Sequence, residues 1–141
     1  MAEQGGGMSG LGCLGCSLRQ RNEWCVLSEE ETRILSRNLK KRQYRAGETI
    51  FSAGEPSHGI YCVVSGAVAI RKGDGEGNAV LLRLAYPGDT LGYRGLLLGE
   101  NRRYSAEALG PSKLCFVDQT VTRLLLDRNS ALGRQFLRRI A

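Results

Sequence analysis

Cysteine spacing is the strongest chemical signal in this sequence of 141 residues. Cys13, Cys16 and Cys25 stand in one short segment, with two and then eight residues between neighbours. The chain has five cysteines, an odd number, so they cannot all be paired in disulfides within one chain. We expect a cytoplasmic protein, for the reasons given below, and the reducing cytoplasm also argues against a disulfide framework. Three thiolates in a loop can converge on one point, so this spacing predicts metal ligation.

Arg19 and Arg21 lie inside the same segment. Their positive charge would stabilise thiolates and offset the negative charge of a thiolate-bound cluster. Two surface arginines without such a role are an equally good interpretation, since a nearby charge influences a thiol only modestly.

A fourth ligand has to come from Cys62 or Cys115. In SKLCFVD, Leu114 and Phe116 point to one face of a strand and Cys115 points to the other, because strand side chains alternate. Both faces of GIYCVVSG are apolar, which predicts that Cys62 is a buried, inert small hydrophobe. We therefore expect Cys115 to face outward as the ligand. The candidate set is Cys13, Cys16, Cys25 and Cys115.

Short apolar runs separated by glycine dominate the chain after Arg42. Glycine numbers 19 of 141 residues, about twice its usual share of roughly 7 per cent. This spacing is typical of strands and turns, and KGDGEGN between two strand-like runs predicts a hairpin loop. We therefore expect a mainly β body.

Helices are predicted on both sides of this body. Ser28 followed by Glu31 is a capping-box pattern that opens a helix over 28–39. The helical period returns at Gln119 and ends at Ala141 without a capping signal, so we expect a fragment of a longer protein. We also expect a second subunit to cover the last apolar stripe. That stripe consists of Leu132, Phe136 and Ile140.

These patterns divide the chain into three parts. Residues 1–27 are expected to be a flexible tail and a cysteine-cluster loop, of which the glycine-rich residues 1–12 are disordered. Residues 28–118 form the N-terminal helix and the β body, and residues 119–141 a helical hinge and the start of a further helix.

Composition excludes several classes of protein. The chain is 42% hydrophobic and 24% charged, as in an ordinary globular domain. It has no apolar run near the roughly 20 residues of a membrane span and no export leader, so we expect a cytoplasmic protein. No nucleophile with a histidine base and no phosphate-binding glycine motif after a strand suggests an enzyme.

The net charge of +6 suggests an anionic partner, but the excess lies in two clusters. Because no groove-reading or aromatic stacking motif accompanies them, solvated helix faces are the preferred interpretation over a nucleic-acid surface. The clusters are Arg37, Lys40, Lys41, Arg42 and Arg45, and Arg123, Arg128, Arg134, Arg138 and Arg139.

Three segments, QYRAGETIFSAGE, IYCVVSGAVAI and PGDTLGYRGLLLGENRRYSAEAL, resemble the sensor domain of the Crp/Fnr family of bacterial transcription regulators. The resemblance runs from about Cys13 to the end of the chain. It implies a double-stranded β-helix, or jelly roll, with flanking helices. The glycines at the family's turn positions are Gly47, Gly54, Gly66, Gly88 and Gly92.

Within this family the Fnr branch fits best, because SKLCFVD looks like the segment with the distant cluster cysteine. The resemblance implies a 4Fe-4S cluster, lost in oxygen, on Cys13, Cys16, Cys25 and Cys115. The spacing of Cys16 and Cys25 departs from that of the best-known members by being longer. Full-length proteins of this branch dimerise along a helix, which here would begin near Asn129 and be truncated. They contact promoter DNA through a helix-turn-helix, absent here, and contact RNA polymerase.

Other ligands remain open. A cyclic nucleotide needs an acidic residue and an arginine, where this chain has Tyr93 and Tyr104, so none is expected. The four thiolates would also suit zinc, a thiol-disulfide switch or a 2Fe-2S cluster. Haem has little support, because the single histidine, His58, falls in a turn.

Overall fold

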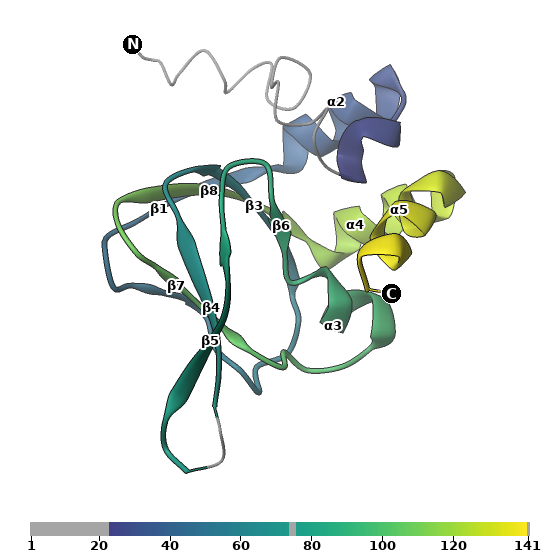
Figure 1. Cartoon of the computed structure of the whole chain (residues 1–141). Helices are drawn as coiled ribbons and strands as arrows, with labels where there is room; N and C mark the ends of the chain where they lie inside the picture. The colour runs from purple at the N-terminus through teal and green to yellow at the C-terminus, as the bar shows by residue number, and fades with distance from the viewer. Residues whose placement is uncertain (1–22, 74–75, 141) are drawn as a thin grey trace.

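The computed structural model describes residues 23–73 and 76–140, with side chains described as far as Arg138. Within these residues two antiparallel four-stranded sheets face each other (Figure 1). The first sheet has the order β1 (Lys40–Tyr44), β8 (Ser112–Asp118), β3 (Gly59–Ser65) and β6 (Thr90–Leu91). The second has the order β2 (Thr49–Phe51), β7 (Ser105–Ala108), β4 (Val68–Gly73) and β5 (Ala79–Ala85).

Five helical segments accompany the sheets in the described part of the chain. They are η2 (Glu23–Val26), α2 (Glu29–Asn38), α3 (Tyr93–Leu98), α4 (Gln119–Arg128) and α5 (Ser130–Ile140). Figure 1 shows α3, α4 and α5 grouped at one side of the sheets, with α2 beside them. The predicted capping box is confirmed, because the Ser28 hydroxyl accepts from the Glu31 amide and Glu31 accepts from the Ser28 amide.

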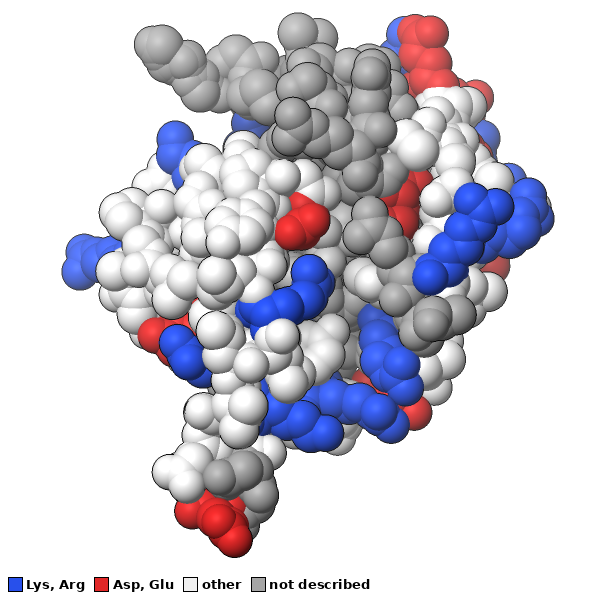
Figure 2. Space-filling model, in the orientation of Figure 1, with Lys and Arg blue, Asp and Glu red and all other residues white. Residues whose placement is uncertain are grey.

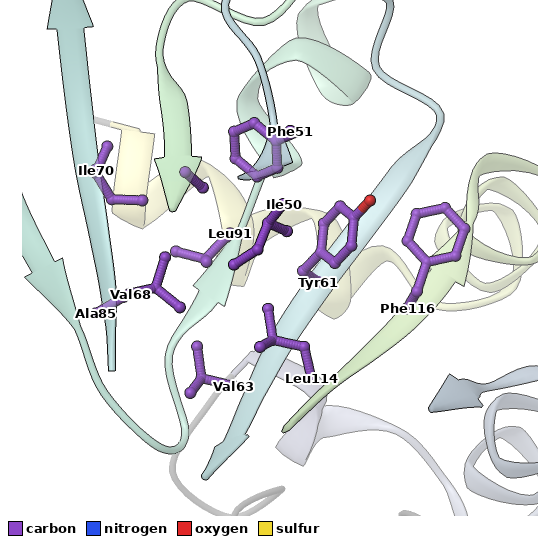
Figure 3. Packing of buried hydrophobic residues seen from close by; sticks show 11 residues of the cluster. Ile50, Phe51, Tyr61, Val63, Val68, Ile70, Ala85, Leu91, Leu114 and Phe116 are labelled. Carbon is purple, nitrogen blue, oxygen red and sulfur yellow. The ribbon is translucent and has the colours of Figure 1, made fainter. Parts of the chain in front are cut away.

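The core between the sheets is formed by the inward residues of both (Figure 3). Its rings pack in sequence, with 5.6 Å between the centroids of Phe51 and Tyr61 and 4.9 Å between those of Tyr61 and Phe116. Val63 and Leu114 lie opposite each other on the paired strands β3 and β8 and are fully buried. Side-chain alternation along these two strands therefore decides which residues face inward.

Turn glycines permit these strand connections. All five glycines expected at turns have a positive φ, between 83° at Gly92 and 98° at Gly88. At Gly66, between β3 and β4, a Cβ atom would also lie only 2.7 Å from the Pro111 carbonyl oxygen. A residue other than glycine would meet both backbone strain and a clash there.

A second buried cluster joins the outer face of the first sheet to the helices. The sheet contributes Ile60 and Val117, which are paired across β3 and β8. The helical layer contributes Trp24, Leu27, Leu35, Leu96, Val121, Leu125, Leu132 and Phe136. The chain thus has one core between its sheets and another between a sheet and its helices.

The apolar stripe of α5 is covered within the same chain. Leu132 and Phe136 are 0% exposed, and the Phe136 ring lies 5.4 Å from Trp24 and 5.2 Å from Tyr93 between centroids. The prediction that a second subunit covers these two residues is wrong, because both are already buried within this chain, Phe136 against η2 and α3. The side chain of Ile140 lies outside the described residues.

The structure also tests the predicted cysteine loop and the predicted hairpin. The segment from Cys13 to Cys25 was expected to be a loop, but its last residues start the short 3-10 helix η2. The predicted hairpin is confirmed by the pairing of β4 with β5, from Val68–Ala85 to Gly73–Ala79. Among the described residues, no helix is long and apolar enough to cross a membrane.

Replacing Phe136 by alanine should lower the free energy of unfolding by about 3–5 kcal/mol, because it leaves a cavity between η2, α3 and α5. Leu137→Ala is the matched control, since Leu137 is 53% exposed on the same helix, and should change stability by less than about 0.5 kcal/mol. Urea unfolding followed by the fluorescence of the single tryptophan, Trp24, measures both. Equal effects of the two substitutions would contradict this arrangement of α5.

Candidate functional site

A row of four side chains crosses the outer face of the first sheet. Lys41 on β1 is paired with Cys115 on β8, Cys115 with Cys62 on β3, and Cys62 with Thr90 on β6. Residues directly opposite each other in antiparallel strands point to the same face. Leu114, next to Cys115, points into the core, so this row faces away from it.

The outward orientation predicted for Cys115 is confirmed, and its side chain is half-buried. The prediction that Cys62 is buried is wrong, because Cys62 is half-buried on the same face, while its predicted inertness stays a prediction. The apolar residue on that face of β3, Ile60, is buried by the helices and not by the opposite sheet. Apolar residues on both faces of a strand therefore do not show which face packs against the opposite sheet and which packs against helices.

A buried hydrogen bond holds η2 beside this row. The Thr90 hydroxyl donates to Glu23 Oε1 over 2.7 Å, and both side chains are at most 5% exposed. Glu23 precedes the exposed Cys25 by two residues on the same short helix. The segment that leads from Cys16 to Glu23 is seven residues long and can reach at most about 25 Å.

The structure describes two members of the predicted ligand set, Cys25 and Cys115. Cys13 and Cys16 lie outside the described residues, as do Arg19 and Arg21. Within residues 23–73 and 76–140, no group of three or more cysteine, histidine or acidic side chains could hold a metal ion. The described thiols, Cys25, Cys62 and Cys115, are not in disulfides.

Donor chemistry nevertheless suits the expected metals. Thiolate sulfur is the usual ligand of iron–sulfur clusters and a common ligand of zinc. Cys115 and Cys25 both reach the surface, and Lys41 adds a positive charge beside Cys115.

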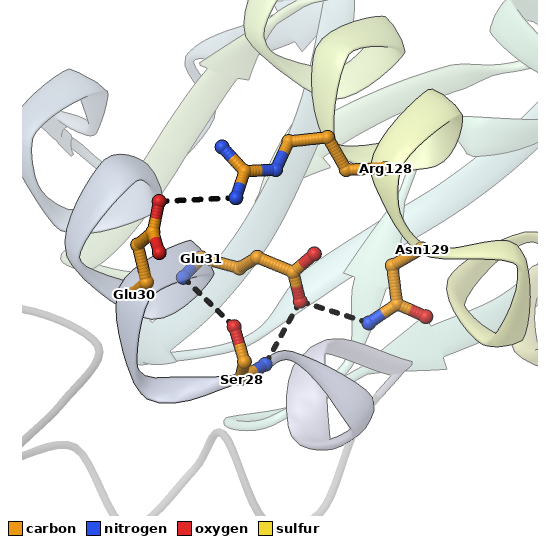
Figure 4. Close-up of polar contacts among 5 residues, drawn as sticks. All are labelled: Ser28, Glu30, Glu31, Arg128 and Asn129. Atoms are coloured by element: carbon orange, nitrogen blue, oxygen red, sulfur yellow. Dashed lines mark hydrogen bonds and ion pairs between the residues drawn. The ribbon is translucent and has the colours of Figure 1, made fainter.

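The segment that follows Cys25 is fastened to the junction of α4 and α5. Figure 4 shows the contacts of its residues Glu30 and Glu31 with Arg128 and Asn129. The Asn129 side-chain amide donates to the Val26 carbonyl over 3.0 Å and to Glu31 Oε1 over 2.9 Å. Arg128 and Glu30 form an ion pair next to it. Hydrogen bonds from the Ser28 amide and from Asn129 hold the pKa of the Glu31 carboxyl below its usual value.

These contacts connect the cysteine-bearing segment with α5. Asn129 is the last residue before α5, and its own side-chain oxygen accepts from the Ala131 amide over 3.0 Å. Trp24, adjacent to Cys25, contacts Phe136 one turn further along. A movement of η2 would therefore act directly on the first two turns of α5.

A second polar site surrounds Arg102, which is only 7% exposed. Its guanidinium lies 4.1 Å from the centroid of Phe51 and donates to the carbonyls of Gly92 and Gly59 over 3.3 and 3.2 Å. Burial lowers the pKa of Arg102. The hollow beside it has a volume of about 10 Å³, which is room for about one water molecule.

The two tyrosines at the expected nucleotide-recognition positions are engaged in packing. The ring of Tyr93 stacks on Phe136, and the ring of Tyr104 lies 6.3 Å from Phe51 between centroids. A buried arginine at this end of the roll is a feature of the fold that the sequence patterns do not predict. The motif GENRRYS gives no signal that separates Arg102 from its exposed neighbour Arg103.

Comparisons with known proteins connect the whole β body to one family. The model of the family described as "Cyclic nucleotide-binding domain" matches residues 41–129. The chain is 28% identical to the nitrogen fixation regulation protein FixK of Bradyrhizobium diazoefficiens over 86% of its length and 51% of the relative's. It is 24% identical to the anaerobic regulatory protein of Pasteurella multocida over 96% of its length and 49% of the relative's.

Two further matches add to this. A CRP-like cAMP-activated global transcriptional regulator of Mycobacterium tuberculosis is 26% identical over 76% of the chain and 48% of the relative. The solved sensor domain of the transcriptional regulator DNR from Pseudomonas aeruginosa superposes with a TM-score of 0.78, at 24% identity, covering 87% of this chain and 83% of that one. The expected jelly roll is thereby confirmed. The chain spans about half the length of the curated relatives it matches.

Stability should depend on pH through Glu31. A carboxyl whose pKa is lowered on folding stabilises the folded state above its unfolded pKa, near 4.5, and this contribution is lost as the pH falls through the folded pKa. Glu31→Gln should therefore flatten the fall in unfolding free energy below pH 4.5. Urea unfolding at a series of pH values measures the unfolding free energy of the original chain and of the variant.

Glu30→Gln provides the matched control one residue away. It removes only the exposed ion pair with Arg128, which is worth about 0–1 kcal/mol. If both glutamine variants keep the original pH profile, the carboxylate of Glu31 does not stabilise the junction.

Proposed function

Since this chain belongs to the cyclic nucleotide-binding domain family, we propose that it is the sensor domain of a Crp/Fnr-type transcription regulator that holds a 4Fe-4S cluster and responds to oxygen. The family membership and the regulatory names of its relatives support the first part. The second part depends on the cysteines. The single observation that supports this second part is that Cys115 points outward from the sheet. It lies in the same row as Thr90, whose hydrogen bond to Glu23 holds η2 beside the sheet.

In this proposal the cluster ligands are Cys13, Cys16, Cys25 and Cys115. Cys25 lies on η2, and the contact between Glu23 and Thr90 keeps that helix next to the outer face of the sheet. Cys13 and Cys16 precede Glu23 by ten and seven residues, so the chain limits them to about 36 and 25 Å from it. When bound, the cluster would supply an oxygen-labile tie between the N-terminal segment and β8.

The residues that follow Cys25 would carry the signal. Asn129 and Phe136 fasten η2 to the start of α5, so the position of η2 biases the position of that helix. In the full-length regulator we propose that the helix after Asn129 joins two subunits. A population shift between two positions of α5 would then alter binding of promoter DNA and of RNA polymerase through segments outside these 141 residues.

Cyclic-nucleotide binding is the main alternative, because the family bears that name and one relative is named as cAMP-activated. We propose that this chain binds none. Tyr93 stands where the ribose hydroxyls would need a carboxylate, and the hollow near Arg102 has room for about one water molecule. Adding cAMP should therefore leave the melting temperature unchanged in thermal unfolding. A rise that saturates with cAMP concentration would contradict this.

The cluster itself is tested by an anaerobic visible spectrum with iron and sulfide measured on the same sample. We expect a broad band near about 400 nm and about four irons per chain, both lost in air. Cys115→Ser should abolish the band, because it removes a ligand on the sheet. Cys62→Ser is the matched control on the adjacent strand β3, and this variant should keep the absorption band.

The outcomes separate the candidate metals. A colourless chain that carries one zinc per molecule, and that takes up no iron and sulfide on reconstitution, would replace the cluster by a zinc site. A band with about two irons per chain before exposure to air would indicate a 2Fe-2S cluster. Loss of the band in Cys62→Ser but not in Cys115→Ser would show that the ligand on the sheet was assigned to the wrong strand.

A further inference from the structure

We propose that Cys62 and Cys115 form a reversible disulfide, which makes this pair of facing strands a site of oxidation by hydroperoxides. The two residues are direct partners in the register of β3 and β8. They are 53 positions apart in the sequence, so the fold alone brings them together. The pairing of Cys62 with Cys115 needs no metal, so the disulfide does not depend on the proposed cluster.

The register gives the backbone separation of the two residues. The Gln119 amide donates to the His58 carbonyl over 2.7 Å, which makes residues 58 and 119 a hydrogen-bonded pair at the end of these strands. Two further steps of two residues along the same register reach Cys62 and Cys115, which are therefore also a hydrogen-bonded pair. Such pairs have Cα atoms about 5.5 Å apart, inside the range of about 4.4–6.8 Å that disulfides span.

The same geometry makes the bond easy to reduce. Opposite Cβ atoms in a sheet lie about 4.5–5.5 Å apart, whereas a disulfide prefers about 3.8 Å. Closing the bond therefore pulls two adjacent strands together against the pairing of both with their neighbours, β1 and β6. Strained disulfides have higher reduction potentials and are the ones that cellular thiols reverse.

Reagents can reach the pair. Both thiols are half-buried on the outer face, where Lys41 at one end of their row is exposed and Thr90 at the other end is buried under η2. The apolar pair Ile60 and Val117 lies two residues along the same strands and is covered by the helices. Cys62 and Cys115 thus lie at the edge of the helical layer, where they are partly covered by it and partly exposed to solvent.

The chemistry needs only a hydroperoxide. One thiolate sulfur attacks a peroxide oxygen, the O–O bond breaks, and a sulfenic acid and a hydroxide form. The second thiolate attacks the sulfenic sulfur, the S–S bond forms, and the S–O bond breaks with loss of a second hydroxide. The two hydroxides take up the protons of the two thiols. Two thiols and one hydrogen peroxide therefore give one disulfide and two water molecules, with two electrons passing to the peroxide.

If the proposed cluster also uses Cys115, the disulfide has a consequence for that site. One sulfur cannot be both a ligand and half of a disulfide, so oxidation of the pair would block assembly of the cluster until a thiol reductant restores Cys115. This consequence, unlike the disulfide itself, rests on the proposed function. Cys62 would then determine whether the site can be refilled.

The test uses the whole chain, treated with a chelator, reduced, and exposed to one equivalent of hydrogen peroxide. We expect an intramolecular link that removes two hydrogen atoms from the mass and leaves three of the five cysteines open to alkylation. Tryptic peptides containing Cys62 and Cys115 should be joined before dithiothreitol and separate after it. Cys62→Ser and Cys115→Ser should each abolish this link.

Cys25→Ser is the matched control, because it removes an exposed thiol outside the pair and should leave the link intact. Circular dichroism of each variant checks that it is folded. A link from Cys115 to Cys13, Cys16 or Cys25, or no link in a folded wild-type chain, would overturn the proposal. The result is separate from the cluster test, since a chain without iron can still form the disulfide and a chain with iron can lack it.

Discussion

The antiparallel pairing of β3 with β8 is the constraint on which the rest of this structure depends. Because side chains alternate along both strands, one register assigns Val63 and Leu114 to the core between the sheets and Ile60 and Val117 to the core under the helices. The same register puts Cys62 opposite Cys115 on the outer face. A shift of one residue would exchange every inward side chain for an outward one. Two hydrophobic cores and one pair of thiols therefore share a single alignment.

The helical layer explains how a site on this sheet could influence a distant partner. η2 has few residues, yet it contacts β6 through Glu23, α5 through Trp24 and the junction of α4 and α5 through Val26. Each contact is buried or half-buried, so none can be lost without cost. The burial of Leu132 and Phe136 means that α5 is already packed in one chain. Any change in how α5 meets a partner would then begin with η2, beside the proposed ligands.

The end of the roll that holds Arg102, Tyr93 and Tyr104 is filled by the protein's own side chains. Arg102 lies under the ring of Phe51 and is held by two backbone carbonyls, while Tyr93 belongs to the helical core. A buried guanidinium with such partners is a packing element, since its charge is satisfied by carbonyl oxygens and ring faces. The chain thus has the family's scaffold, while the chemistry proposed for it rests on its cysteines.

Local patterns in the sequence were sufficient for the capping box at Ser28, the turn glycines, the outward orientation of Cys115 and, with the family resemblance, the jelly roll. Each depends on neighbours within a few residues or on motifs that the family shares. The positions of Cys62, Phe136 and Arg102 did not follow, because each depends on an element distant in the sequence. Alternation tells which residues share a face of a strand, but what covers that face is decided only when sheet and helices pack together.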